Sequence, residues 1–186
     1  MNRFSFLRQY MFRPRAVGAV LPSSKYLADK MVEGIDFAGA RCVVEFGAGT
    51  GVFTEKILQM RPLGAVVIVF EMNKAFCLEL AEKFAEEENL YILNESAVSI
   101  GKHIRRHGFE FADVIISGLP FTSLSAEVGE GILKEARSWL RPCGCFVTFQ
   151  YTLFKKGFIE QFFDNVEITR EVRNVPPAYV LRCCSK

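Results

Sequence analysis

The stretch Val43-Val44-Glu45-Phe46-Gly47-Ala48-Gly49-Thr50-Gly51 decides the fold of this chain. Two β-branched residues precede an acid, three glycines stand at alternate positions, and apolar residues at helical spacing follow. This order predicts a β-strand, a tight turn and the N-terminus of an α-helix. Glycine lets the backbone of such a turn approach a ligand closely, and the helix aims free N–H groups at whatever is bound. The stretch therefore predicts a ligand-binding turn.

The spacing of the glycines separates two classes of ligand. A dinucleotide fingerprint, Gly-x-Gly-x-x-Gly, has its third glycine at position 52, where this chain has Val52. Glu45 stands two residues before the first glycine, where it favours a ligand with positive charge and would repel a pyrophosphate. The pattern Glu-x-Gly-x-Gly-x-Gly resembles motif I of the class I S-adenosylmethionine-dependent methyltransferases, in which this loop cradles the methionine end of the cofactor. The alternative is a glycine-rich turn in an unrelated α/β domain.

The composition restricts the class of protein. The chain has 186 residues, of which 50% are hydrophobic, and this predicts one packed domain rather than disorder. A net charge of +2 predicts no strong nucleic-acid surface. The six cysteines form no Cys-x-x-Cys pair, so we expect buried thiols in the cytoplasm and no metal site. No apolar run approaches the roughly 18 residues that span a bilayer, and arginines interrupt the N-terminus, so no apolar signal core is expected.

Apolar runs that predict strands alternate with helical patterns along the chain. After the strand of the quoted stretch we expect strands at 65–70, 90–93, 112–116 and 145–151, and then an antiparallel hairpin of 166–173 and 178–183. Pro142 and Gly144 are expected to close the helix before the fifth strand, and 158–163 to form another helix. We therefore predict an α/β fold with a mostly parallel, seven-stranded sheet, a C-terminal antiparallel hairpin and helices on both faces. Residues 41–186 would form its core within a single domain.

The N-terminal 40 residues divide into two predicted segments. Residues 1–13 place Phe4, Leu7 and Met11 on one helical face, and all their charged side chains are arginines. Such a helix suits an anionic membrane surface, and on pattern alone packing against the protein's own domain is an equal alternative. Residues 14–40 are expected to form a loop, interpreted as a lid, and a helix capped by a serine.

Polar residues gather at the carboxyl ends of the predicted strands, which is the edge where ligands bind in such sheets. Glu71 lies about 20 residues past the glycine turn, the offset of an acid that accepts both ribose hydroxyls. Glu95 is a candidate acceptor for the adenine amino group, with a solvated loop acid as the alternative. His103 and His107 are interpreted as part of a solvated basic face. The candidate cofactor-binding residues are Glu45, Gly47, Ala48, Gly49, Gly51, Glu71, Met72, Glu95, Ser96 and Ser117.

Four motifs make the chain resemble the bacterial phospholipid N-methyltransferases, a family related in fold to the rRNA adenine dimethylases. They are Phe-Arg-Pro-Arg-Ala-Val-Gly-Ala at 12–19 with Pro-Ser-Ser at 22–24, the glycine motif at 45–51, Ser-Gly-Leu-Pro-Phe at 117–121, and Asn-Val-Pro-Pro-Ala at 174–178. Asn94-Glu95-Ser96 departs from the family's usual Gly-Asp-Ala, which affects the expected adenine contact.

This resemblance implies a Rossmann-like class I methyltransferase that uses S-adenosyl-L-methionine to methylate the amine of phosphatidylethanolamine. It also implies a cytoplasmic enzyme that lies on the inner face of the membrane and contacts anionic lipid through residues 1–13. The candidate catalytic residues are Ser117, Leu119, Pro120 and Phe121.

The chemistry at such a site consists mainly of alignment, because the sulfonium already activates the methyl group. The ammonium group of the acceptor must first lose a proton. Tyr10, Tyr151 and Tyr179 are candidate bases, and the pattern selects none of them. The rings of Phe121 and Tyr151 would face a cationic product or pack in the core.

Two other functions remain open on the sequence. Nucleic-acid adenine N6-methyltransferases carry Asn or Asp at the position of Ser117 and an aromatic that stacks on a flipped base, and Leu119-Pro120-Phe121 fits that pattern in part. A protein that binds S-adenosylmethionine at the membrane without catalysis would share the same glycines and acids.

Overall fold

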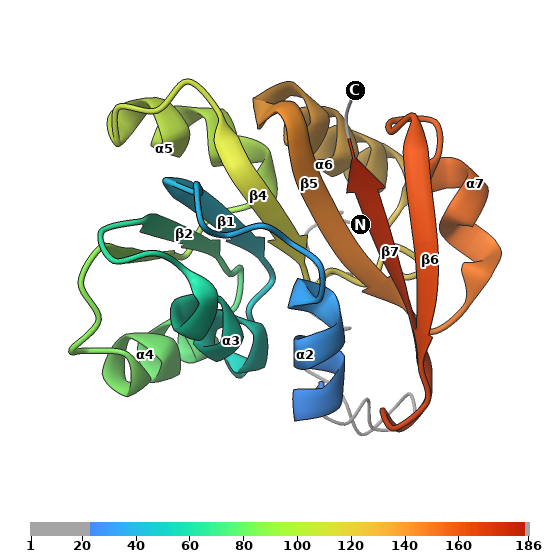
Figure 1. Ribbon diagram of the computed structural model, residues 1–186, viewed down its shortest axis with the longest axis horizontal. Helices are drawn as coiled ribbons and strands as arrows, with labels where there is room; N and C mark the ends of the chain where they lie inside the picture. Colours follow the sequence, from blue (N-terminus) through green and yellow to red (C-terminus); the bar gives the residue numbers. More distant parts are fainter. Residues whose placement is uncertain (1–22, 185–186) are drawn as a thin grey trace, which may run out of the picture.

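The computed structural model describes residues 23–184, so the helix expected at 1–13 and the loop at 14–22 lie outside the described residues. Its centre is a seven-stranded sheet with the order β3-β2-β1-β4-β5-β7-β6 (Figure 1). Strands β1 to β5 are parallel, β7 is antiparallel to β5, and β6 is antiparallel to β7. This sheet confirms the predicted fold class. The strands are β1 (Cys42–Phe46), β2 (Val66–Phe70), β3 (Leu90–Leu93), β4 (Ala112–Ser117), β5 (Leu140–Gln150), β6 (Asn165–Glu171) and β7 (Ala178–Cys184).

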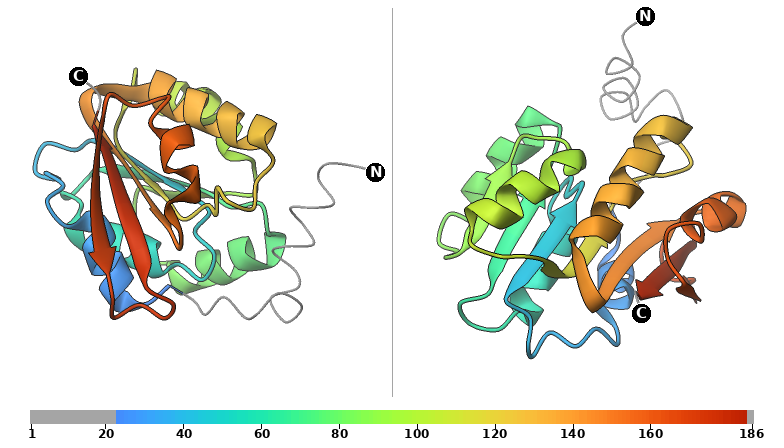
Figure 2. Two further views of the ribbon diagram at one scale, coloured as in Figure 1. Left: turned by 90° about the vertical axis from the view of Figure 1, so that its right-hand side faces the viewer. Right: turned by 90° about the horizontal axis from the view of Figure 1, so that it is seen from above.

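Helices cover both faces of the sheet, as the alternation of patterns predicts (Figure 2). One face carries α2, α3 and α4, and the other carries α5, α6 and α7. The helices are α2 (Lys25–Val32), α3 (Val52–Met60), α4 (Lys74–Lys83), α5 (Ile100–Arg106), α6 (Ala126–Trp139) and α7 (Lys156–Ile159), with short 3₁₀ turns η1 (Ala97–Ser99) and η2 (Leu153–Lys155).

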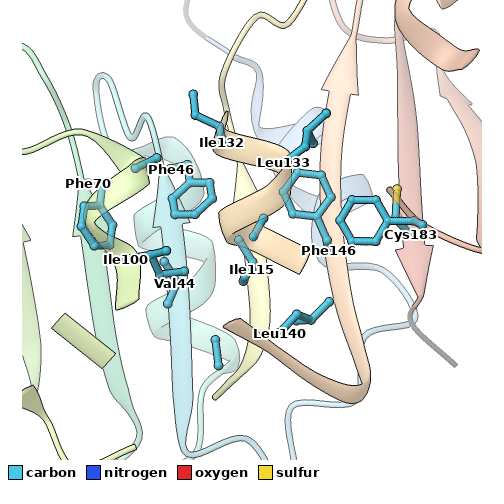
Figure 3. Packing of buried hydrophobic residues seen from close by; sticks show 14 of the residues in the cluster. Val44, Phe46, Phe70, Ile100, Ile115, Ile132, Leu133, Leu140, Phe146 and Cys183 are labelled. Atoms are coloured by element: carbon cyan, nitrogen blue, oxygen red, sulfur yellow. The ribbon is translucent and has the colours of Figure 1, made fainter. Parts of the chain in front are cut away.

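The apolar runs of the central strands explain why the sheet is covered on both sides. Successive side chains of β1 point to opposite faces, so Val44 and Phe46 pack towards α6 while Val43 packs towards α2 and α3. Figure 3 shows Val44, Phe46 and Phe146 in the first of these two cores. Each of these side chains is fully buried. Burying a side chain of this size contributes about 1.5–3 kcal/mol, so the central strands dominate the stability of the fold.

The fifth strand begins earlier than the sequence predicts. Leu140 already pairs with Ala112, and the next pair is Cys145 with Val114, so β5 bulges outward over the residues between. Pro142 and Gly144 lie in this bulge rather than at a helix end. A bulge accepts proline because its N–H is not needed by the neighbouring strand. The predicted helix over 158–163 is also shorter, since α7 ends at Ile159.

Candidate functional site

The loops after β1 and β4 lie next to each other at the point where the chain crosses over to opposite faces of the sheet. The chain leaves β1 for α3 on one face and leaves β4 for α6 on the other face, and ligands bind at such switch points. Gly118 donates from its N–H to the Phe46 carbonyl at 2.8 Å, and Gly47 donates to the Phe70 carbonyl at 2.7 Å. A Cβ on Gly118 would lie 2.5 Å from the Gly47 carbonyl oxygen. Two glycines are therefore needed for the loops to pass this closely.

The glycine loop leaves open space above Gly49. Its φ of +54° lies in the left-handed region, and a Cβ there would meet nothing within 4 Å. Its N–H donates to Glu71 Oε2 at 2.9 Å, which joins the loop after β1 to the end of β2. Gly51, with φ +79°, is the N-cap of α3. The loop thus leaves backbone and a helix N-terminus free to meet a ligand.

Glu71 is buried at the carboxyl end of β2, with 1% of its surface exposed. Its Oε2 accepts from Gly49, and its Oε1 accepts from the Asn73 N–H at 2.8 Å. Burial raises the pKa of this carboxyl, while the backbone N–H groups act in the opposite direction. An ionised carboxylate offers about four acceptor positions, and the backbone N–H groups of Gly49, Asn73 and Met72 act on this one, which leaves room for a hydroxyl of a ligand. The geometry suits the ribose contact expected for Glu71.

Glu45 lies directly beneath the glycine loop and is completely buried. Thr54, on α3, donates its hydroxyl to Glu45 Oε2 at 2.6 Å, whereas Oε1 has no hydrogen-bond partner among residues 23–184. Burial raises the pKa of Glu45 to about 8, and the nearby Glu71 carboxyl adds to this increase. A cationic ligand in the loop would favour the ionised form.

Replacing Glu45 with glutamine should change how stability depends on pH. The folded-state pKa of about 8 lies above the ordinary value of 4.5, so between these values the folded chain holds a proton that the unfolded chain has lost. Wild-type stability then falls as pH rises through this window. Glutamine cannot ionise, so the variant should exceed the wild type in free energy of unfolding by about 2–4 kcal/mol at pH 8–9, with little difference near pH 4.5.

Urea unfolding of both proteins at several pH values measures this difference. Glu55, a partly exposed acid on α3, supplies the control because Glu55→Gln should leave the slope between pH 6 and 9 unchanged. Identical slopes for wild type and Glu45→Gln would show that Glu45 does not hold a proton in the folded state.

A pocket opens between the glycine loop, the ends of β2 and β3, and α6. Six of the predicted residues line it, including Glu95, Ser96 and Leu119. The sequence did not anticipate the apolar wall that η1 and α6 supply. The lining residues are Gly47, Phe70, Glu71, Met72, Glu95, Ser96, Ala97, Leu119, Leu124, Val128 and Ile132.

Glu95 is held in place at the pocket by two basic side chains. Lys102 Nζ lies 3.0 Å from its Oε1, and His103 Nε2 lies 3.1 Å from its Oε2. These contacts lower the pKa of Glu95 to about 2, and the hydrogen bond with His103 makes the largest contribution. His103 is 2% exposed and packs edge-on against Phe70, so the interpretation of His103 as part of a solvated face was wrong. Residue type and helical spacing could not show that this histidine turns inward to the acid.

The segment after β4 contributes both pocket and core. Ser117 is fully buried, and its hydroxyl accepts from the Leu119 N–H at 3.3 Å. Gln150 Nε2 donates to the Leu119 carbonyl at 3.3 Å, a contact that the sequence analysis missed although Gln150 ends the neighbouring strand. Phe121 is 1% exposed in the α6 core, which agrees with the core-packing alternative for its ring. Pro120 is half-buried between these residues.

The structure describes two of the three tyrosines considered as bases. Tyr151 follows β5 and packs edge-on against Phe149. Tyr179, on β7, is the strand partner of Gln150 at the end of β5. Arg170 lies 5.4 Å from the Tyr179 ring. Tyr10 lies outside the described residues. Both described tyrosines stand at the edge that carries the pocket.

Comparison with known proteins identifies the family to which the chain belongs. A family model described as "Methyltransferase small domain" matches residues 19–175. The chain belongs to this methyltransferase family. Membership confirms the predicted enzyme class, an S-adenosylmethionine-dependent methyltransferase, and the predicted cofactor.

Two curated relatives of this methyltransferase differ in how much they share with it. An ornithine lipid N-methyltransferase of Singulisphaera acidiphila is 32% identical over 97% of this chain and 94% of that protein. Ribosomal RNA small subunit methyltransferase A of Persephonella marina is 35% identical, but over only 45% of this chain and 31% of that protein.

Solved structures support the methyltransferase fold at low identity. An rRNA methylase from Streptococcus thermophilus has a TM-score of 0.65 at 15% identity and covers 86% of this chain and 95% of its own. The Thermus thermophilus 16S rRNA N2 G1207 methyltransferase, solved with AdoMet and guanosine, has a TM-score of 0.67 at 22% identity over 92% of this chain and 45% of its own.

Two features are absent from the described residues of the methyltransferase. No helix in the described part of the chain is long and apolar enough to cross a membrane. Between residues 23 and 184 no cluster of three or more His, Cys, Asp or Glu side chains is arranged to hold a metal ion.

Proposed function

We propose that this methyltransferase transfers methyl groups from S-adenosylmethionine to the amine of a membrane lipid of the phosphatidylethanolamine type. The similarity to an ornithine lipid N-methyltransferase over nearly the whole of both chains carries this proposal. Both lipid classes present an amine at the membrane surface, so one site could align either of them. The acceptor that the sequence motifs imply, phosphatidylethanolamine, is the first to test.

The residues of the chain would act mainly by alignment. Glu71 would hold the ribose, Glu95 with Ser96 the adenine, and Glu45 beneath the glycine loop would balance the positive charge of the cofactor. The cofactor supplies an activated methyl group, so holding the acceptor amine in line could contribute several kcal/mol. Ser117, Leu119 and Pro120 would form the wall against which the acceptor rests, with Gln150 fixing the Leu119 backbone.

The attachment of the N-terminal segment supports a membrane-facing site. The Ser24 N–H donates to Asn174 Oδ1 at 3.0 Å, and Asn174 Nδ2 donates to the Pro176 carbonyl at 2.7 Å. Asn174 is 2% exposed in the turn between β6 and β7, which stands at the same edge as the ends of β1 and β4. Residues 1–22 therefore enter the domain at the edge of the sheet that carries the pocket. We propose that 1–13 bind anionic lipid on the inner face of the membrane and that the following loop covers the site.

A nucleic-acid substrate is the second candidate function. The match to a ribosomal RNA methyltransferase over part of the chain favours it. The net charge of +2 and the Ser117-Gly118 pair count against it, since adenine chemistry uses Asn or Asp at that position. A cofactor-binding protein without catalytic activity is a third possibility.

One methyl-transfer assay separates these functions. Purified protein with labelled S-adenosylmethionine should label phosphatidylethanolamine in vesicles, and the rate should rise with anionic lipid and fall with salt. Parallel reactions contain ornithine lipid, phosphatidylcholine as a lipid without a free amine, or total RNA. Label in RNA but not in any lipid would overturn the proposal, and cofactor binding without any transfer would favour the non-catalytic alternative.

A further inference from the structure

An exposed aromatic side chain follows the carboxyl end of β5. Phe154 is 85% exposed and its neighbour Leu153 is 39% exposed, both in η2. Two lysines come next: Lys155 lies 4.9 Å from the ring of Phe158, and Lys156 pairs with Glu160 in the following turn. The described residues bury little of the Phe154 side chain, so it contributes little to the stability of the fold, and a surface outside the fold could bury it.

The position of η2 links this side chain to the pocket. Helix α7, directly after η2, packs on α6 at Gly129, where a Cβ would lie 3.2 Å from the Phe158 ring. The preceding residue of α6, Val128, lines the pocket. Because β5 is parallel to β4 and β1, its end and η2 stand at the same edge of the sheet as the glycine loop (Figure 1).

A second exposed apolar group lies at this edge, in the turn between β6 and β7. Val172 is 63% exposed and Val175 is 66% exposed, on either side of Arg173. Arg173 is anchored by Glu171, with Nε and Nη2 at 2.9 and 2.8 Å from the two carboxylate oxygens, and lies over the Tyr26 ring. Both groups therefore combine protruding apolar side chains with neighbouring cations.

We propose that η2 and the β6–β7 turn insert into the interface of an anionic bilayer and hold the pocket against it. This inference rests on the proposed lipid acceptor. Phe154 and Leu153 would enter the boundary between headgroups and acyl chains, while Lys155 and Lys156 would extend to lipid phosphates. The two loops at this edge carry exposed apolar side chains with cations beside them, and this arrangement is complementary to the surface of an anionic bilayer. The headgroup amine would then reach the site without leaving the interface.

A tryptophan scan tests insertion directly. The chain has one tryptophan, so Phe154→Trp adds a single reporter that can be compared with the wild-type background. Leu63→Trp is the matched control, because Leu63 is 105% exposed in the loop that enters β2 at the opposite edge. With vesicles of phosphatidylglycerol and brominated phosphatidylcholine, Phe154→Trp should be quenched well above background and Leu63→Trp should not. Equal quenching of the two variants, or no quenching of Phe154→Trp, would overturn the proposal. The second result is also expected if residues 1–22 cover η2.

A loss-of-contact variant measures the size of the effect. Phe154→Ser in the full-length chain should raise the dissociation constant for anionic vesicles about tenfold, while Leu63→Ser leaves it unchanged. Methyl transfer to vesicle phosphatidylethanolamine should show a matching rise in KM, whereas transfer to a short-chain monomeric analogue keeps its rate. An unchanged vesicle affinity would contradict this proposal alone. Normal vesicle binding with no transfer to either lipid would instead contradict the proposed function.

Discussion

Replacing Glu71 with alanine should lower the affinity for S-adenosylmethionine by roughly ten- to a hundredfold. The variant loses a charge-assisted hydrogen bond to the ribose, worth about 1.5–3 kcal/mol. It also removes the acceptor for the Gly49 N–H, so the glycine loop loses its link to β2. Both effects act on the same ligand, so both should contribute to the loss of affinity. Isothermal titration calorimetry of the two proteins gives the affinities.

Glu171 supplies a matched control for this measurement. Glu171 also ends a strand and is 3% exposed. Its carboxylate accepts a hydrogen bond from the Arg173 N–H at 2.8 Å, just as Glu71 accepts one from the N–H of Asn73, again two residues further along the chain. Glu171→Ala should therefore lose a similar local structure without changing cofactor affinity. If Glu71→Ala binds the cofactor as wild type does, or if both variants lose affinity equally, the ribose assignment is wrong.

Replacing Gly118 with alanine should destabilise the fold and weaken cofactor binding together. The new methyl would stand 2.5 Å from the Gly47 carbonyl oxygen, which is backbone and cannot rotate away. Separating the two loops should cost about 1–3 kcal/mol, or roughly 2–12 °C in melting temperature for a chain of this size. The glycine loop would move with Gly47, so the pocket should change shape. Thermal unfolding and calorimetric titration report the two consequences.

Gly131 is the control for this second variant. It lies within α6, and a Cβ there would meet nothing closer than Val98 at 3.8 Å. Gly131→Ala should raise stability by about 0.5–1 kcal/mol, because alanine loses less conformational freedom than glycine in a helix. A Gly118→Ala protein as stable as wild type, with normal cofactor affinity, would show that the close approach of the loops is not required.

The local pattern of the sequence was sufficient for the fold class and for the position of the glycine turn. Strand, glycine turn and helix over 43–60 follow from periodicity and from the few residues that accept positive φ. The position of Glu71 at the end of β2 followed from its distance along the chain from the glycine turn. One helix and one strand need a nearly fixed number of residues to return to the carboxyl edge of the sheet. Helices on both faces followed from strands that are apolar on both sides.

The tertiary structure decided the contacts between residues that are distant in sequence. Thr54 under Glu45, His103 against Glu95 and Gln150 on the Leu119 backbone depend on which way each side chain turns after packing. The Ser24–Asn174 bond joins residues 150 positions apart, and no local pattern encodes such a pair. Burial, with a smaller contribution from the Glu71 carboxyl, raises the pKa of Glu45 to about 8. Residue types and spacing thus determined the strands and the turn, whereas desolvation and long-range packing, which exist only in the folded chain, decided the chemistry of the site.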